Sequence, residues 1–135
     1  MIHGLFFAPI VALLCIVGFL HLLALSESLY FIYGWLDLVV HFLSGIAIGV
    51  TFLWLYMKQA LKNGQRKTFA KVLLVSIFTA LLIASAWEVF EFKIGLTFTS
   101  NNYAFDTLTD ILITVVGGLI SAFYIRAIMR KELAV

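Results

Sequence analysis

Residues 36–57 read LDLVVHFLSGIAIGVTFLWLYM, a stretch in which Asp37 and His41 are the only residues of the Asp, Glu, Lys, Arg and His types. A helix needs roughly 20 apolar residues to cross a hydrocarbon core about 30 Å thick, and this stretch is long enough. Three further stretches meet the same requirement, namely residues 5–25, 69–92 and 105–129. The sequence therefore predicts an all-α polytopic membrane protein, a bundle of four transmembrane helices.

Composition supports a membrane protein with a single domain over residues 1–135. The chain is 64% hydrophobic and 12% charged, whereas soluble domains are about 45–50% apolar and about 25% charged. The net charge of +2 does not indicate nucleic acid as a partner, because the basic residues lie beside apolar segments rather than in a stripe with aromatic residues. The expected partner is the lipid bilayer itself.

The basic residues predict the orientation. Residues 58–67 together with Lys71 hold five of the nine Lys and Arg residues, and Arg126, Arg130 and Lys131 follow the last apolar stretch. Cytoplasmic loops are enriched in such residues, so we expect both termini on the cytoplasmic side of the plasma membrane. Residues 5–25 are expected to be a retained helix, because no Lys or Arg precedes them and the apolar run exceeds that of a signal peptide. Position 64 should then be labelled only after permeabilisation, and position 101 in intact cells.

The last three apolar stretches contain six acidic or histidine residues, all in the half expected to face outward. They form three pairs at helical spacing, Asp37/His41, Glu88/Glu91 and Asp106/Asp110. Residues three or four positions apart share a helix face, so each pair can point into the bundle. Ionisable residues inside a membrane are costly and are candidates for a functional site.

Five carboxylates cannot all stay ionised in a low-dielectric site without a counter-charge, which bound protons, a metal ion or a cationic ligand could supply. Carboxylates with one imidazole suit Mg, Ca, Mn, Zn or Fe. The predicted roles are catalytic for Glu88, Asp110 and His41 and binding for Asp37, Glu91 and Asp106. The predicted ligands of a divalent metal are Asp37, His41, Glu88, Glu91 and Asp110.

Several of these residues have simpler structural roles open to them. The alternatives are helix capping for Asp37 and Asp106 and an ion pair with Lys93 for Glu91. Glu88 and His41 have no comparable alternative. His21, near the end of the first stretch, is more typical of an interfacial residue than of a ligand, and Trp87 suits either the interface or a pocket wall.

Small residues indicate where helices approach closely. Gly45 and Gly49 form a GxxxG pattern, and Gly117-Gly118 lies in the middle of the fourth stretch. Such residues favour packing inside the bundle, with an oligomer through Gly45 and Gly49 as the alternative. Tyr30, in the connection before the second stretch, is expected with its neighbouring aromatic residues at the membrane–water interface.

The motifs resemble those of small bacterial membrane proteins of the VanZ-like and YjdF-like group. The matching features are Asp37-x3-His41-x3-Gly45, Trp87-Glu88-x2-Glu91 and Asp106-Thr107-x2-Asp110 followed by Gly117-Gly118. The resemblance covers about two-thirds of the chain. It departs at Leu38, where YjdF-like proteins tend to have an arginine. VanZ-like proteins are associated with reduced susceptibility to teicoplanin-type glycopeptides, which implies a role at the cell envelope without defining a reaction.

Three functions remain open at this point. The first is an outward-facing acidic/His pocket that binds a divalent metal or a polar or cationic ligand and handles a lipid-linked or envelope substrate. The second is a non-catalytic membrane interaction module. The third is a proton- or cation-coupled transporter, although the inner half of the three acidic helices lacks buried charge above the basic residues at their ends.

Overall fold

The computed structural model describes residues 2–63, 68–96 and 102–133, and side chains within residues 7–128 apart from 61, 64–67 and 97–101. Its elements are α1 (Ile2–Ser26), α2 (Leu29–Ile32), α3 (Trp35–Lys62), α4 (Phe69–Ile94) and α5 (Tyr103–Leu133). The described residues contain no strand. The long helices α1, α3, α4 and α5 are each long and apolar enough to cross a membrane, which confirms the all-α class and the four predicted spans.

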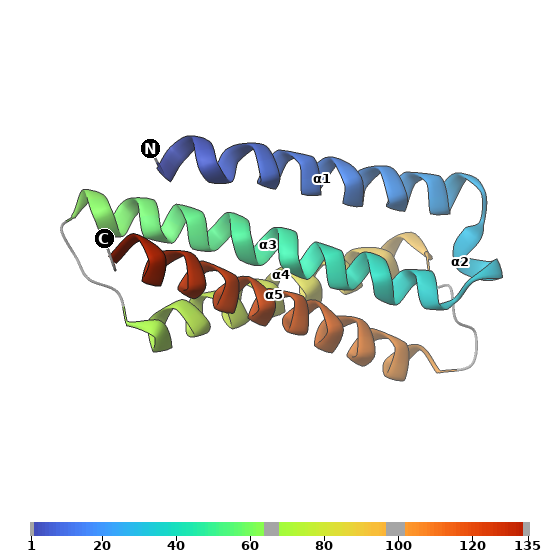
Figure 1. The fold of residues 1–135 in the computed structure, drawn as a ribbon. Helices are drawn as coiled ribbons and strands as arrows, with labels where there is room; N and C mark the ends of the chain where they lie inside the picture. Colours follow the sequence, from blue (N-terminus) through green and yellow to red (C-terminus); the bar gives the residue numbers. More distant parts are fainter. Residues whose placement is uncertain (1, 64–67, 97–101, 134–135) are drawn as a thin grey trace.

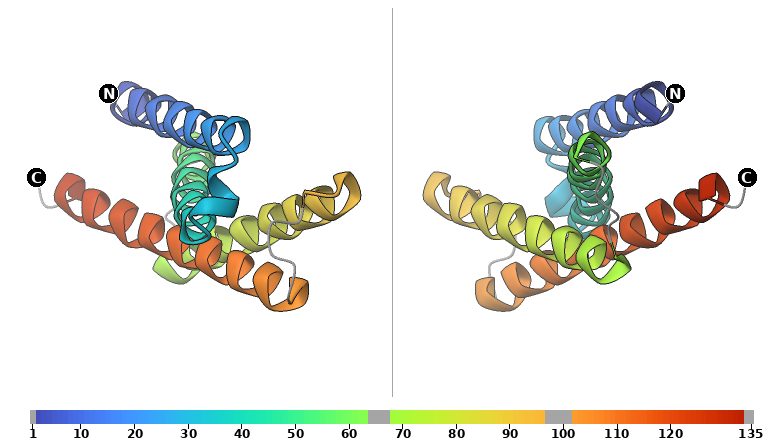
Figure 2. Two further views of the ribbon diagram at one scale, coloured as in Figure 1. Left: turned by 90° about the vertical axis from the view of Figure 1, so that its right-hand side faces the viewer. Right: turned by 90° about the vertical axis from the view of Figure 1, so that its left-hand side faces the viewer.

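The helices surround α3, which contacts every other element (Figure 1, Figure 2). The most extensive packing is between α3 and α5, and α4 packs against both of them. Among the described residues, α1 packs only on α3 and on the short α2. Both termini lie at the end of the bundle where α3 ends and α4 begins, which we call the basic end (Figure 1). The opposite end, where α3 begins and α4 ends, is called the acidic end.

Helix boundaries follow local signals rather than membrane thickness. The helix α3 continues five residues past the predicted Met57, because Lys58 to Lys62 contains no helix breaker. At the acidic end, α4 ends at its C-cap Gly95, whose φ of 74° lies in the left-handed region that glycine adopts without strain. The helix α5 begins after Asn102, whose side-chain oxygen accepts the backbone N–H of Phe105 at 3.3 Å.

The glycines predicted to mark close helix packing lie between α3 and α5. A Cβ on Gly45 would overlap the backbone carbonyl oxygen of Thr114, and a Cβ on Gly117 would overlap that of Phe42. A Cβ on Gly49 would come within 2.7 Å of Ser121 Cβ. This glycine face is therefore covered by α5 of the same chain. This packing contradicts the alternative of an oligomer through Gly45 and Gly49, because α5 leaves no free surface there for a second copy.

The half of the bundle near the basic end is closed by apolar packing. Its buried cluster joins Leu53 of α3, Val72 of α4 and Ile125 of α5, with Ile10 of α1. No Asp, Glu, Lys, Arg or His belongs to this cluster of described residues. Among the described residues, the buried acidic and histidine side chains of His41, Glu88, Glu91 and Asp110 all lie toward the acidic end.

Candidate functional site

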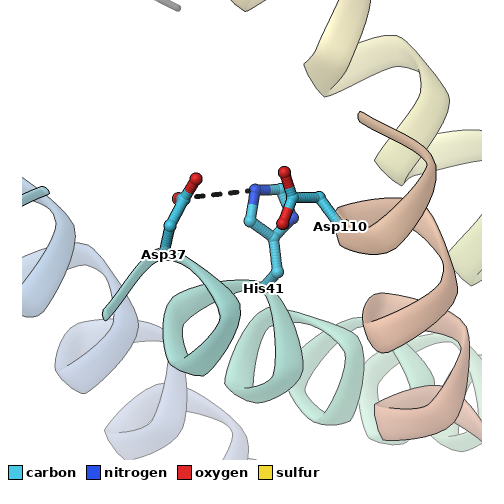
Figure 3. Close-up of side chains that lie close together, drawn as sticks. All are labelled: Asp37, His41 and Asp110. Carbon is cyan, nitrogen blue, oxygen red and sulfur yellow. Dashed lines mark ion pairs between the residues drawn. The ribbon is translucent and has the colours of Figure 1, made fainter. Parts of the chain in front are cut away.

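Five of the six predicted site residues converge at the acidic end. His41 from α3, Glu88 and Glu91 from α4 and Asp110 from α5 are all buried, with 3–6% of each residue exposed, and Asp37 is half-buried. One ligand atom from each of Asp37, His41 and Asp110 lies within 4.8 Å of the others, and the same holds for His41, Glu88 and Glu91. Figure 3 shows Asp37 and Asp110 on either side of the His41 ring. His41 is thus the residue that the two groups share.

The Nε2 atom of His41 faces two carboxylates from different helices. It lies 3.7 Å from Asp37 Oδ1, one turn earlier on α3, and 3.7 Å from Glu88 Oε1 on α4. A direct N–H···O hydrogen bond is shorter, at about 2.7–3.2 Å. Each carboxylate is therefore too far from Nε2 for a short hydrogen bond, and Asp37 and Glu88 belong to different groups of close ligand atoms.

The other ring nitrogen of His41 is fixed by α5. Thr114 Oγ1 donates its only proton to the backbone carbonyl of Asp110 at 2.7 Å, so toward His41 Nδ1, 3.2 Å away, it can act only as an acceptor. In this arrangement Nδ1 carries a proton and donates it to Thr114. In the neutral ring this leaves Nε2 with its lone pair facing Asp37 and Glu88. Three negative or lone-pair groups thus face one another with no counter-charge among them.

Two carboxylate oxygens in this cluster lack a hydrogen-bond partner among the described residues. Glu88 Oε1 and Asp110 Oδ1 are each buried without a donor. Leaving a buried polar group unsatisfied costs about 1–3 kcal/mol, and more for a charged group. These oxygens could therefore accept a proton or a metal ion, and the predicted metal-binding role of both residues stays a prediction.

The structure also tests the simpler roles of helix capping and ion pairing that were open to Asp106, Asp37 and Glu91. Asn102 rather than Asp106 supplies the capping oxygen of α5, so the capping alternative for Asp106 is wrong. Asp106 is half-buried one turn before Asp110 and belongs to neither group of close ligand atoms. Asp37 lies inside the first turn of α3 and faces His41. Glu91 is buried with His41, and within the described part of the chain it forms no ion pair with the exposed Lys93.

A cavity of about 320 Å³ reaches the site from the α1 side. Its polar wall residues are His21, Asp37, His41, Ser44 and Thr114, and the remaining wall residues are apolar or glycine. Trp87 lines this cavity, so of its two predicted roles the pocket wall applies. The rings of Trp87 and His21 form a T-shaped contact with centroids 5.2 Å apart, which links α4 to α1 at the acidic end.

Tyr30 is a buried part of this region and not the interfacial residue that its position suggested. It is 3% exposed, and a hydrogen bond of 2.8 Å joins its hydroxyl to His21 Nδ1. Burial, together with the negative charges of Asp37 and Glu91, raises the pKa of the Tyr30 hydroxyl above its ordinary value. The Tyr30 hydroxyl is therefore neutral, and its hydrogen bond orients His21 in the cavity wall.

Sequence reasoning missed Thr114, Ser44 and Tyr30. Thr114 could have been found, because it follows Asp110 by four residues and thus shares its helix face. Ser44 likewise follows His41 by three residues. Nothing in the local pattern marks Tyr30, since α2 turns it inward and the short helix has no clear signal in the sequence.

Together these features define a polytopic α-helical membrane protein with a buried acid/His cluster near one end of its bundle. Over residues 5–131 the chain matches the model of the family described as "Predicted membrane protein (DUF2238)", and it belongs to that family. No curated protein and no solved structure matches it.

Proposed function

We propose that the acid/His cluster binds a divalent transition metal ion between His41, Glu88 and Glu91, one of the two groups of close ligand atoms. The observation that carries the proposal is the lone pair of His41 Nε2, which Thr114 directs at two carboxylates 3.7 Å away. Asp37 and Asp110 form the other close group with His41 and lie near enough to accept a proton from a metal-bound water. One imidazole with carboxylates favours Zn, Mn or Fe.

The distances between His41 Nε2 and the carboxylate oxygens support a bound metal ion over a direct ion pair. Ligand atoms at about 2.0–2.2 Å from a tetrahedral zinc ion are separated by roughly 3.4 Å. The two distances of 3.7 Å from His41 Nε2 are close to this span and exceed the length of a good hydrogen bond. The donation from His41 to Thr114 also corresponds to the outer hydrogen bond that orients metal-binding histidines.

The chemistry that fits such a centre is Lewis-acid activation of water or of a substrate oxygen. A bound metal would lower the proton affinity of a water molecule, and the unpartnered Asp110 oxygen is placed to accept the released proton. We assign Glu88 and His41 to the metal and Asp110 to proton transfer. The expected substrate is a lipid-linked or envelope molecule, in keeping with the likeness to VanZ-like proteins, on which the metal proposal does not rest.

A transport pathway is less well supported. The buried cluster around Leu53 and Val72 is apolar, and among the described residues the buried acidic and histidine side chains all lie toward the acidic end. A non-catalytic module would require the carboxylates to be paired among themselves, whereas Glu88 and Asp110 each retain a buried oxygen that has no donor in the described part of the chain.

The proposed orientation places the acidic end toward the outside and the basic end in the cytoplasm. Positions 64 and 101 lie outside the described residues, so the exposed Asn63 and Asn102 are the better reporters. In a Cys15→Ser background, a cysteine at position 63 should react with an impermeant maleimide only after permeabilisation. A cysteine at position 102 should react in intact cells. The reverse pattern would place the site on the cytoplasmic side.

Thr114→Val tests the metal proposal through the residue that orients His41. Removing the hydroxyl leaves Nδ1 without its acceptor, so affinity for Zn²⁺ and Mn²⁺ should fall about 10–100-fold in competition titrations with a chromophoric chelator in detergent. Thr114→Ser keeps the hydroxyl and should restore most of the affinity. Thr109→Val is the matched control, because Thr109 makes the same bond to the carbonyl four residues earlier without contacting a histidine. Equal affinities for Thr114→Val and Thr114→Ser would contradict the role of Thr114.

A further inference from the structure

We infer that the cavity beside the acid/His cluster holds the hydrocarbon chain of a bilayer lipid. This inference deepens the proposed function, on which it rests for the fate of the lipid headgroup, and it names the substrate class as a lipid that enters from the membrane. Its evidence comes from the lining, direction and entrance of the cavity, none of which depends on a bound metal.

The lining is that of a site for an apolar ligand with one polar end. Leu14, Val17, Ala47, Ile48 and Ile83 contribute hydrocarbon walls, and at Gly18 there is no atom within 4 Å of where a Cβ would be. The volume of about 320 Å³ lies at the lower end of the range of small-molecule pockets, about 300–1,000 Å³. Five polar side chains gather around the His41 region, where a headgroup oxygen could meet the proposed metal.

The cavity runs in the direction that a lipid chain takes in a leaflet. Along α3 it extends from Asp37 to Ile48, which at 1.5 Å per residue corresponds to roughly 16 Å along the helix axis. On α1 and α4 it extends from His21 to Leu14 and from Trp87 to Ile83, again away from the acidic end. A lipid with its head at the depth of His41 would therefore point its chain toward the middle of the bilayer.

The cavity also has a side on which a lipid can enter. Within the described residues α1 packs on α3 and α2 and has no helix packing with α4, although residues of both α1 and α4 line the cavity. The contact between the rings of His21 and Trp87 bridges α1 and α4 at the acidic end. Farther from the acidic end, α1 and α4 flank the apolar cavity without packing against each other. A chain can thus pass from the bilayer into the cavity between α1 and α4.

The experiment uses a phosphatidylglycerol that carries a diazirine midway along one acyl chain, mixed into vesicles containing the full-length protein. After irradiation, adducts mapped by mass spectrometry should include the half-buried Ile48 and Ile83 as well as the exposed faces that bulk lipid reaches. Gly18→Leu fills the cavity from α1 and should abolish the adducts at Ile48 and Ile83. Ala12→Leu adds the same side chain on the exposed part of α1 and should leave them unchanged.

Metal content is measured on the same samples, so the two proposals can fail separately. Adducts at Ile48 and Ile83 that are absent in the wild type, or that persist undiminished in Gly18→Leu, would overturn the chain-binding inference whatever the metal content. Adducts that depend on Gly18 in a protein that binds no Zn²⁺ or Mn²⁺ would support the lipid cavity and overturn the metal centre. Loss of adducts in both Gly18→Leu and Ala12→Leu would also contradict the inference, because a filled cavity would then not be the cause.

Discussion

Glu88→Gln is expected to abolish metal retention while the protein stays folded. The substitution keeps the side-chain shape and removes the charge at Oε1, which lies 3.7 Å from His41 Nε2 and lacks a hydrogen-bond donor among the described residues. The loss of affinity should exceed the roughly 10–100-fold typical of an outer hydrogen-bond partner, because a ligand itself is removed. Elemental analysis and chelator competition on protein purified in detergent give the measurement.

The melting temperature separates this role from a structural one. A buried carboxylate without a partner destabilises the folded bundle, so Glu88→Gln without metal should melt at the same temperature as the metal-free wild type or higher. Asp106→Asn is the matched control, since Asp106 lies at the same end of the bundle but outside both groups of close ligand atoms. It should keep the metal. Unchanged metal content in Glu88→Gln would remove Glu88 from the proposed centre.

Gly45→Ala is expected to cause the largest loss of stability among single-methyl substitutions. The added Cβ would meet the carbonyl oxygen of Thr114, and backbone cannot move aside as a flexible side chain can. Overpacking a well-packed core costs typically about 1–3 kcal/mol, and here α3 and α5 would have to separate at the level of the site. Metal affinity should fall as well, because that separation moves Thr114 away from His41.

Gly18→Ala provides the control for Gly45→Ala with an effect of opposite sign. A Cβ at Gly18 has nothing within 4 Å, and alanine is favoured over glycine inside a helix by about 1 kcal/mol. Thermal unfolding in one detergent should therefore move the two variants in opposite directions from the wild type. A Gly45→Ala variant as stable as Gly18→Ala would mean that α3 and α5 do not approach as closely as described.

The sequence allowed the four spans and the convergence of the acidic residues to be predicted for physical reasons. A membrane admits few solutions for long apolar stretches, and i, i+4 spacing fixes which side chains share a face. His41, Glu88 and Asp110 were found in this way because ionisable residues stand out against an apolar background.

Features that depend on how the helices are placed against one another could not be predicted. The packing of α1 on α3 creates the cavity, and α1 itself carries little amphipathic pattern that would have indicated which face turns inward. The short α2 turns Tyr30 toward His21, which no local spacing indicates. The separation of Asp106 from the close ligand groups likewise depends on where α5 lies relative to α4.

The proposed metal centre is tested most directly by anomalous X-ray scattering. The data are recorded from crystals of the wild-type protein across the Zn, Mn and Fe absorption edges. We expect one strong peak among His41, Glu88 and Glu91, with ligand distances of about 2.0–2.2 Å if the ion is zinc. If protein exposed to these metals shows no anomalous peak at this position, the carboxylates share protons instead. That result would contradict the proposed metal centre.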